Sequence, residues 1–219
     1  MMTNETLSLP YRLGVLVLIL AAWLAVYFLI NRREVDPERR KTFDTELDRK
    51  TPFWPPFAIV YFSTYIFVIQ PFLVLSDARQ FYWMAVTFSA ITILSSIIHA
   101  AVPSKIERME LAEVGGVSGL MLNLFQKTCK PYGNFPSMHV GLSVPVVAAN
   151  YMAGGPVVGT LTLIWGVLIA LSTLFTKQHT ILDVLAGLTG GLLVFFTTFA
   201  LMTPLQKGKK PTQKQESLI

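Results

Sequence analysis

The chain has 219 residues, of which 53% are hydrophobic and only 14% are charged, and its mean hydropathy is +0.53. This balance argues against an ordinary soluble domain and predicts an integral membrane protein. The net charge of +5 comes mostly from loops and the C-terminal tail, where membrane proteins place cations, so we expect no nucleic-acid partner.

Six apolar segments approach the length of about 20 residues that a bilayer-spanning helix needs. In chain order they are residues 11–30, 53–75, 81–102, 137–153, 156–175 and 181–202. The first is too long for the apolar core of a signal peptide, and no small-residue cleavage site follows it. Gly154-Gly155-Pro156 predicts a hairpin between the fourth and fifth spans. Gly187 and Gly191 form a GxxxG pattern, which is typical of close helix packing.

The connections between these spans differ in composition. Residues 31–52 are rich in both signs of charge and predict an interfacial or helical connector, whereas residues 103–136 form the longest loop. We predict an all-α, polytopic membrane helix bundle with six transmembrane helices, forming one domain over residues 1–203. Residues 204–219 predict a disordered basic tail.

With six spans, three of the connections lie on the same side of the membrane. These connections are residues 31–52, 103–136 and 176–180. Polar side chains of several kinds therefore meet at one surface: Lys105, Arg108, Ser137, His139, Lys177, His179 and Asp183. Imidazoles, a carboxylate, a hydroxyl and cations in one place favour a phosphate-handling site.

His179 and Asp183 are four residues apart at the start of the last span, so both can lie on one helical face. A carboxylate there can accept a hydrogen bond from one imidazole nitrogen and leave the other nitrogen as a nucleophile. The alternative is a carboxylate that only caps the start of the helix.

Pro136-Ser137-Met138-His139 stands at the start of the fourth span, where Ser137 is a candidate N-cap. Free backbone N–H groups at such a helix start bind anions, and His139 would lie near enough to protonate a leaving oxygen. The alternative is an ordinary serine cap beside an interfacial histidine.

Three loop cations, Lys105, Arg108 and Lys177, would neutralise a bound phosphate. The alternative for each is a cation at the lipid headgroup surface. His99 near the end of the third span is a functional candidate because it is intramembrane, although a hydrogen bond between helices is the interpretation we prefer.

These motifs resemble those of the type 2 phosphatidic acid phosphatase (lipid phosphate phosphatase) superfamily. That family has P-S-G-H followed by S-R-x5-H-x3-D; this chain has P-S-M-H at 136–139 and S-T-x5-H-x3-D at 172–183. The spacing of Ser, His and Asp, the order of the motifs and their places in the third and fifth loops all match. The resemblance covers roughly residues 103–191.

The chain also departs from the family pattern. Met138 replaces the glycine of the first motif, and Thr173 replaces the arginine of the second. The family's K-x6-R-P motif is reduced to V-P-S-K-I-E-R at 102–108. These departures, with D-R-K-T-P-F-W-P-P at 48–56, look similar to the branch of inositol phosphorylceramide and sphingomyelin synthases, which transfer a phospho-headgroup to an alcohol.

By this resemblance, His179 attacks phosphorus, Asp183 orients His179, and His139 protonates the leaving oxygen before activating water or an alcohol. The phosphoryl oxygens would be held by four further side chains, Ser137, Lys105, Arg108 and Lys177. The family uses no cofactor and no metal ion, and the sequence has no cluster of acids suited to one.

The leading hypothesis is an integral-membrane lipid phosphate phosphatase or phosphotransferase that forms a phosphohistidine. A headgroup phosphotransferase similar to inositol phosphorylceramide synthase is one alternative. A non-catalytic, proton-coupled carrier with His139, His179 and Asp183 as its relay is another. The expected partners are a lipid phosphate and membrane lipids in a plasma or bacterial inner membrane; lipid identity, membrane side and oligomeric state stay open.

Overall fold

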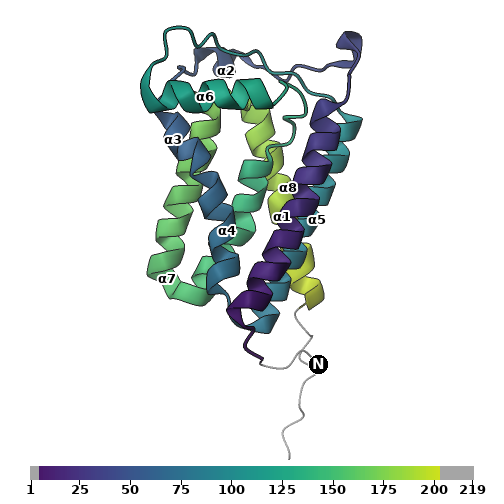
Figure 1. Ribbon diagram of the computed structural model, residues 1–219, viewed down its shortest axis with the longest axis vertical. Coiled ribbons are helices and arrows are strands. Elements are labelled where there is room, and N and C mark those ends of the chain that lie inside the picture. Colours follow the sequence, from purple (N-terminus) through teal and green to yellow (C-terminus); the bar gives the residue numbers. More distant parts are fainter. Residues whose placement is uncertain (1–4, 203–219) are drawn as a thin grey trace, which may run out of the picture.

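The computed structural model describes residues 5–202, and within that range the chain is helical and has no strand (Figure 1). The predicted tail, residues 204–219, lies outside the described residues. The elements, in chain order, are α1 (Leu9–Arg32), the short 3-10 helix η1 (Pro37–Arg39), α2 (Glu46–Lys50), α3 (Phe57–Phe62), α4 (Thr64–Val74), α5 (Ala78–Ala101), α6 (Gly116–Thr128), α7 (Met138–Phe175) and α8 (Ile181–Met202).

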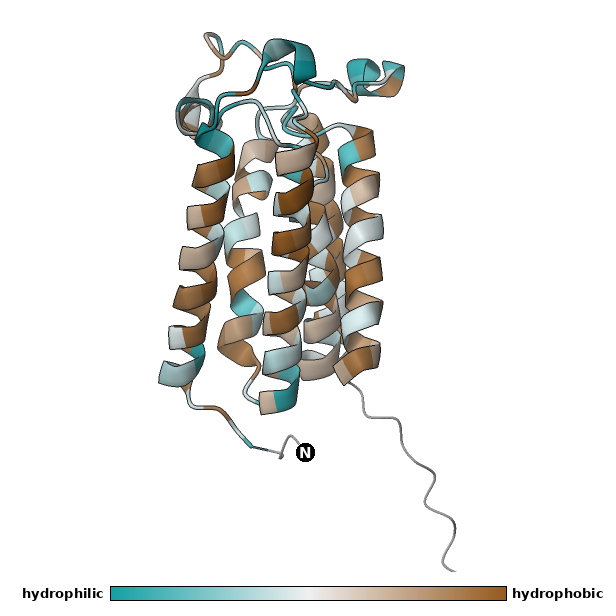
Figure 2. Cartoon of the chain, turned by 90° about the vertical axis from the view of Figure 1, so that its right-hand side faces the viewer, coloured by the Kyte–Doolittle hydropathy of each residue, from teal (hydrophilic) through white to brown (hydrophobic). Residues whose placement is uncertain are grey.

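Five helical stretches have the length and apolar composition to cross a membrane: α1, α3 with α4, α5, α7 and α8. The residues along these helices are largely apolar, as the colours of Figure 2 show over the length of the bundle. In α1, for example, Leu18 is 72% exposed. Large exposed apolar side chains along whole helices are stable only against lipid, so the chain is an integral membrane protein.

The fourth and fifth predicted spans form one element, α7, which folds back on itself. Gly155 inside it has a φ of 71°, a left-handed conformation that glycine adopts without steric cost. The Tyr151 hydroxyl lies 3.0 Å from the Thr160 hydroxyl across this turn. The predicted hairpin is therefore confirmed, and the six predicted spans correspond to five stretches, one of which turns back (Figure 1).

The three connections that were expected on one side of the membrane do lie at one end of the bundle (Figures 1 and 2). This polar end carries η1, α2 and α6, while the α7 turn lies at the opposite end. The polar connector 31–52 contains η1 and α2, as a helical connector would.

The expectation that residues 103–136 form only a loop is wrong, because Gly116–Thr128 within this segment form helix α6. It lies across the polar end, buries Leu122 against Ala58 of α3, and leaves Leu120 and Leu124 exposed. The segment is only 13 residues long and amphipathic, so a search for continuous apolar spans does not find it.

The second predicted span also differs, because it begins after Pro55-Pro56 and is interrupted at Ser63 between α3 and α4. Proline lacks a backbone N–H group and fits best at the first turn of a helix, which agrees with the start of α3 directly after Pro55-Pro56.

Close packing of α8 on α7 sets the positions of the site residues. A Cβ atom built on Gly187 would lie 2.3 Å from the Ser137 carbonyl oxygen, and one on Gly191 would lie 2.6 Å from that of Gly141. Both distances are shorter than any real contact, so only glycine permits this approach. The GxxxG pattern therefore brings the start of α8 against the start of α7.

Candidate active site

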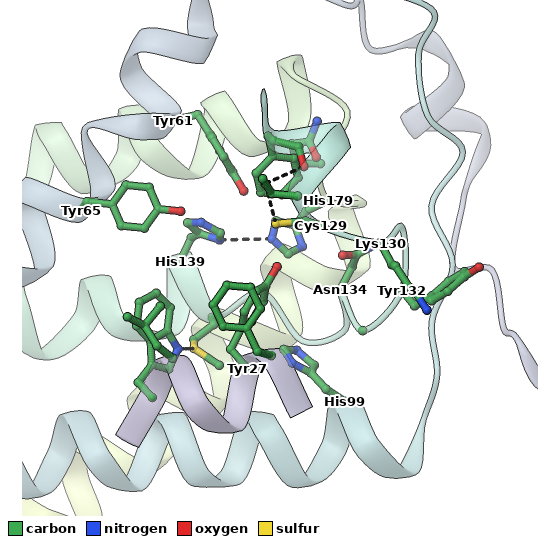
Figure 3. Close-up of a pocket in the computed structure, with 18 of the residues that line it drawn as sticks. Tyr27, Tyr61, Tyr65, His99, Cys129, Lys130, Tyr132, Asn134, His139 and His179 are labelled. Carbon is green, nitrogen blue, oxygen red and sulfur yellow. Dashed lines mark hydrogen bonds between the residues drawn. The ribbon is translucent and has the colours of Figure 1, made fainter. Parts of the chain in front are cut away.

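Two histidines from different elements meet at the polar end of the bundle. His139 lies in the first turn of α7, and His179 lies two residues before the start of α8. The Nε2 atom of His179 is 3.3 Å from the Nδ1 atom of His139 (Figure 3). The Tyr61 ring of α3 packs on His139 with a centroid separation of 4.8 Å. The two imidazoles therefore face one another through defined nitrogens.

Asp183 lies on the other side of His179, with Oδ2 3.5 Å from Nδ1 of the imidazole. The same oxygen accepts the Thr180 N–H at 2.8 Å, and the Asp183 N–H donates to the Thr180 hydroxyl at 3.2 Å. The carboxylate is thus both a helix cap and a neighbour of the histidine, so the two interpretations of this motif are compatible.

Ser137 occupies the N-cap position of α7, as its place in the motif predicts, but its hydroxyl makes no capping bond. The residue is fully buried, and its Oγ atom has no hydrogen-bond partner within the described residues. Its N–H donates to the Asp183 carbonyl oxygen at 2.9 Å. A buried hydroxyl without a partner, beside the free N–H groups of a helix start, is arranged to receive an anion.

The three candidate cations occupy different surroundings. Lys177 donates its ammonium to the carbonyl oxygens of Asp48, at 2.5 Å, and Thr51. Arg108 donates to the carbonyl oxygens of Gln126, at 2.6 Å, and Cys129, near the end of α6. The structure therefore holds both groups on backbone carbonyls rather than beside the histidines.

Lys105 is exposed and lines the same polar cavity as Arg108 and Lys177. Partial burial lowers the pKa of the Arg108 guanidinium from its usual value. The Arg108 guanidinium nevertheless stays charged, because the pKa of arginine is far above neutral pH.

His179 lines two cavities of opposite character. The first, of about 360 Å³, is bounded by aromatic side chains from α1, α3, α4 and α6, including Tyr27, Tyr61, Tyr65 and Phe125 (Figure 3). The second, of about 890 Å³, is bounded mainly by polar residues from within segments 42–53, 105–110 and 174–180, with apolar residues such as Phe53 among them. A molecule with an apolar tail and a charged head could occupy both at once.

Three residues near the histidines carry contacts that the motifs alone do not indicate. His99 Nε2 donates to the Pro136 carbonyl oxygen at 2.9 Å, so the imidazole ties α5 to the segment just before α7. Thr173 is fully buried, and its carbonyl accepts the His179 N–H at 3.1 Å. Asp48 is buried and accepts the Ile181 N–H at 2.7 Å. Asp48 begins the D-R-K-T-P-F-W-P-P run and completes the capping pattern Thr45-x-x-Asp48, but neither pattern indicates a partner at the start of α8.

Among residues 5–202, no group of three or more histidine, cysteine, aspartate or glutamate side chains is arranged to hold a metal ion. Comparison with protein families gives one match: the PAP2 superfamily, over residues 41–197. Comparisons with curated proteins and with solved structures give no match. The matched range contains both histidines, Asp183, Ser137 and the segment around Asp48.

Proposed function

The chain belongs to the PAP2 superfamily, and from that premise we propose that it transfers the phosphoryl group of a phosphorylated lipid through a phosphohistidine at His179. Membership in this superfamily supports phosphatase or phosphotransferase chemistry in general terms. The observation that carries the specific proposal is the chain of contacts from His139 through His179 to Asp183, beside the unpartnered hydroxyl of Ser137.

His179 is the nucleophile in this proposal because its two nitrogens have different neighbours. Asp183 faces Nδ1, which favours a proton there and a lone pair on Nε2. The negative carboxylate also stabilises the positive charge that the ring gains when Nε2 bonds to phosphorus. The contact between Nε2 and His139 must open as substrate enters, because a lone pair in a hydrogen bond cannot attack.

His139 is the general acid and base. Its Nδ1 faces the reacting nitrogen of His179, so a leaving oxygen on the attacked phosphorus falls within its reach. Protonated His139 gives its proton to that oxygen as the P–O bond breaks. The neutral ring then takes a proton from water or an alcohol, which attacks the phosphohistidine and restores free His179.

The phosphoryl oxygens are held by Ser137 and the backbone N–H groups at the start of α7. This helix start carries partial positive charge, and the buried Oγ of Ser137 has an unused donor. Lys105, Arg108 and Lys177 add positive charge around the polar cavity. Such electrostatic stabilisation supplies most of the catalysis in phosphoryl transfer.

A lipid is the substrate class that suits the two cavities. The aromatic cavity accepts apolar chains, and the polar cavity accepts the phosphorylated headgroup, with His179 in the wall of both. The protein would then work at the surface of a plasma or bacterial inner membrane, drawing its substrate from the lipid around it.

The test uses the purified full chain in detergent micelles containing phosphatidic acid. We expect wild type to release phosphate and to acquire a phosphate-derived, acid-labile label. His179→Ala should lose both turnover and label while retaining its melting temperature, since the imidazole makes no backbone contact that holds the fold together. Undiminished turnover in this variant would contradict the proposed mechanism.

The same assay separates hydrolysis from transfer. The replacement of the family arginine by Thr173 and the likeness of residues 48–56 to headgroup transferases favour an alcohol acceptor as the second candidate. Free phosphate released without any added alcohol supports hydrolysis. A label that turns over only when an alcohol such as inositol or a diacylglycerol is supplied supports transfer.

A further inference from the structure

The segment 45–54 packs directly on the loop that carries His179. Four interactions join them: Asp48 with the Ile181 N–H, Lys177 with the Asp48 and Thr51 carbonyls, and the Trp54 N–H with the Phe175 carbonyl at 2.8 Å. They bind the loop on both sides of His179, at residues 175 and 177 before it and at residue 181 after it. The loop is therefore anchored to a part of the chain that is more than 100 residues away in sequence.

Asp48 uses both carboxylate oxygens in this contact. Oδ2 accepts the N–H group of Thr45 at 2.9 Å and its hydroxyl at 2.5 Å, which caps α2. Oδ1 accepts the Ile181 N–H, one of the groups at the start of α8 that lacks a partner within the helix. A buried carboxylate at a helix start is stabilised by the positive end of the helix dipole. This anion therefore occupies the start of α8 and leaves the start of α7 for substrate.

Lys177 completes the contact from the opposite direction. Its ammonium donates to the carbonyl oxygens of Asp48 and Thr51, at the end of α2, where a cation is favoured by the helix dipole. Its own backbone has a φ of 55°, a left-handed conformation that a side chain other than glycine adopts at a cost. The surrounding contacts must hold the loop in this conformation.

We propose that Asp48 and Lys177 are positioning residues that form a reciprocal clamp and hold the imidazole of His179 between His139 and Asp183. The proposal rests on the proposed function for the role of His179. In this proposal Lys177 positions the loop, whereas its place in the sequence predicted that it binds phosphate. Asp48, in turn, gains a role in the reaction although it does not touch the substrate.

The clamp matters because His179 lies outside both helices. Its N–H is bonded to the Thr173 carbonyl, and within residues 5–202 its side chain makes polar contacts only with His139 and Asp183, at 3.3 and 3.5 Å. A small shift of the loop would lengthen both distances. A misplacement of about 1 Å at a reacting group can lower a rate about 100-fold.

The variants are Asp48→Asn and Lys177→Met, with Glu46→Gln as the matched control. Asparagine has the same shape as aspartate, but its NH2 group cannot accept a hydrogen bond. It would therefore face the N–H donor of Thr45 or of Ile181 and lose one of these two bonds. Glu46 is an exposed residue of the same short helix, and its ion pair with Lys50 spans 2.6 Å. Lys177→Arg serves as the conservative variant, because a guanidinium can still donate to two carbonyl oxygens.

Three quantities are measured on the full chain in phosphatidic acid micelles: kcat, the inhibition constant of inorganic phosphate, and amide hydrogen exchange of the peptide spanning 175–182. We expect both variants to lose about 100-fold in kcat. Phosphate inhibition should change less than about twofold, and the amides of residues 178, 179 and 181 should exchange faster. The double variant should lose little more than either single variant, whereas Glu46→Gln stays at wild-type values and Lys177→Arg recovers part of kcat.

Two results would overturn the clamp. One is wild-type kcat and wild-type exchange in Asp48→Asn. The other is a weaker phosphate inhibition in Lys177→Met with unchanged exchange, which would identify Lys177 as a phosphate ligand. Failure of the proposed function looks different, because turnover would then survive in His179→Ala. The exchange measurement still tests the clamp in that case, since it needs no activity.

Discussion

At the scale of single residues, the site depends on polar groups that the fold leaves without partners. Ser137 Oγ, His179 Nδ1 and Asp183 Oδ1 are all buried and lack a good hydrogen bond within the described residues. Stable proteins satisfy most such groups, and an unsatisfied one costs about 1–3 kcal/mol. In the proposed mechanism His179 Nδ1 faces Asp183, whereas Ser137 Oγ gains its partner from the bound phosphate rather than from the fold.

Ser137→Ala tests this interpretation. The variant removes a buried hydroxyl that bonds to nothing, so we expect its melting temperature to equal or exceed that of wild type. If the hydroxyl binds phosphate, kcat/KM for phosphatidic acid falls about tenfold or more, because a hydrogen bond to a charged group contributes about 1.5–3 kcal/mol. Thermal unfolding and steady-state kinetics on one preparation measure both. A loss of stability with unchanged kcat/KM would contradict the assignment.

At the scale of elements, the site is a junction of helix ends. The start of α7 supplies Ser137 and His139, and the start of α8 supplies Asp183 with the loop before it. The two starts touch because Gly187 lies against the Ser137 carbonyl, with a bond from the Ser137 N–H to the Asp183 carbonyl. Catalytic geometry here is a consequence of how closely two backbones approach.

Gly187→Ala should therefore separate the two helix starts. The added methyl group would overlap the Ser137 carbonyl, and relief of such overpacking costs about 1–3 kcal/mol. We expect a lower melting temperature and a loss of most of kcat. Gly190→Ala is the matched control on the same helix: nothing lies within 4 Å of its Cβ position, so activity should persist. Equal losses in the two variants would contradict the role of this contact, because helix propensity alone favours alanine over glycine and would stabilise both.

At the scale of the whole molecule, the chain separates a polar end from an apolar body. The three connections, η1, α2 and α6 gather at the end that carries the histidines, and the turn of α7 lies at the other (Figures 1 and 2). A bilayer around the body keeps the polar end in water and gives the aromatic cavity access to lipid chains.

Cys129, the single cysteine, allows a test of this orientation. It lies at the polar end, whereas Ala153 is exposed beside the turn of α7. A membrane-impermeant maleimide added to sealed vesicles should label wild-type Cys129 from one side only. In a Cys129→Ser background, Ala153→Cys should be labelled only from the other side. Labelling of both positions from the same side would contradict the six-crossing arrangement.

Much of the architecture could be predicted from the sequence because membrane insertion depends on local composition. Continuous apolar runs indicated the spans, and Gly154-Gly155-Pro156 indicated the hairpin in α7. Helix α6 was missed because it is short and amphipathic, and its apolar face is defined only by the α3 surface beneath it.

The sequence by itself determined the class of protein and the identity of the candidate reacting groups, since the spacing of Ser137, His139, His179 and Asp183 is carried by two short motifs. Only the tertiary structure decided which nitrogens face one another and where the cations point. Lys177 and Arg108 donate to carbonyl oxygens of distant segments, and Asp48 reaches Ile181. The physical reason is that hydrogen bonds depend on where chain ends and loops converge in space, whereas span formation depends on the hydropathy of neighbouring residues.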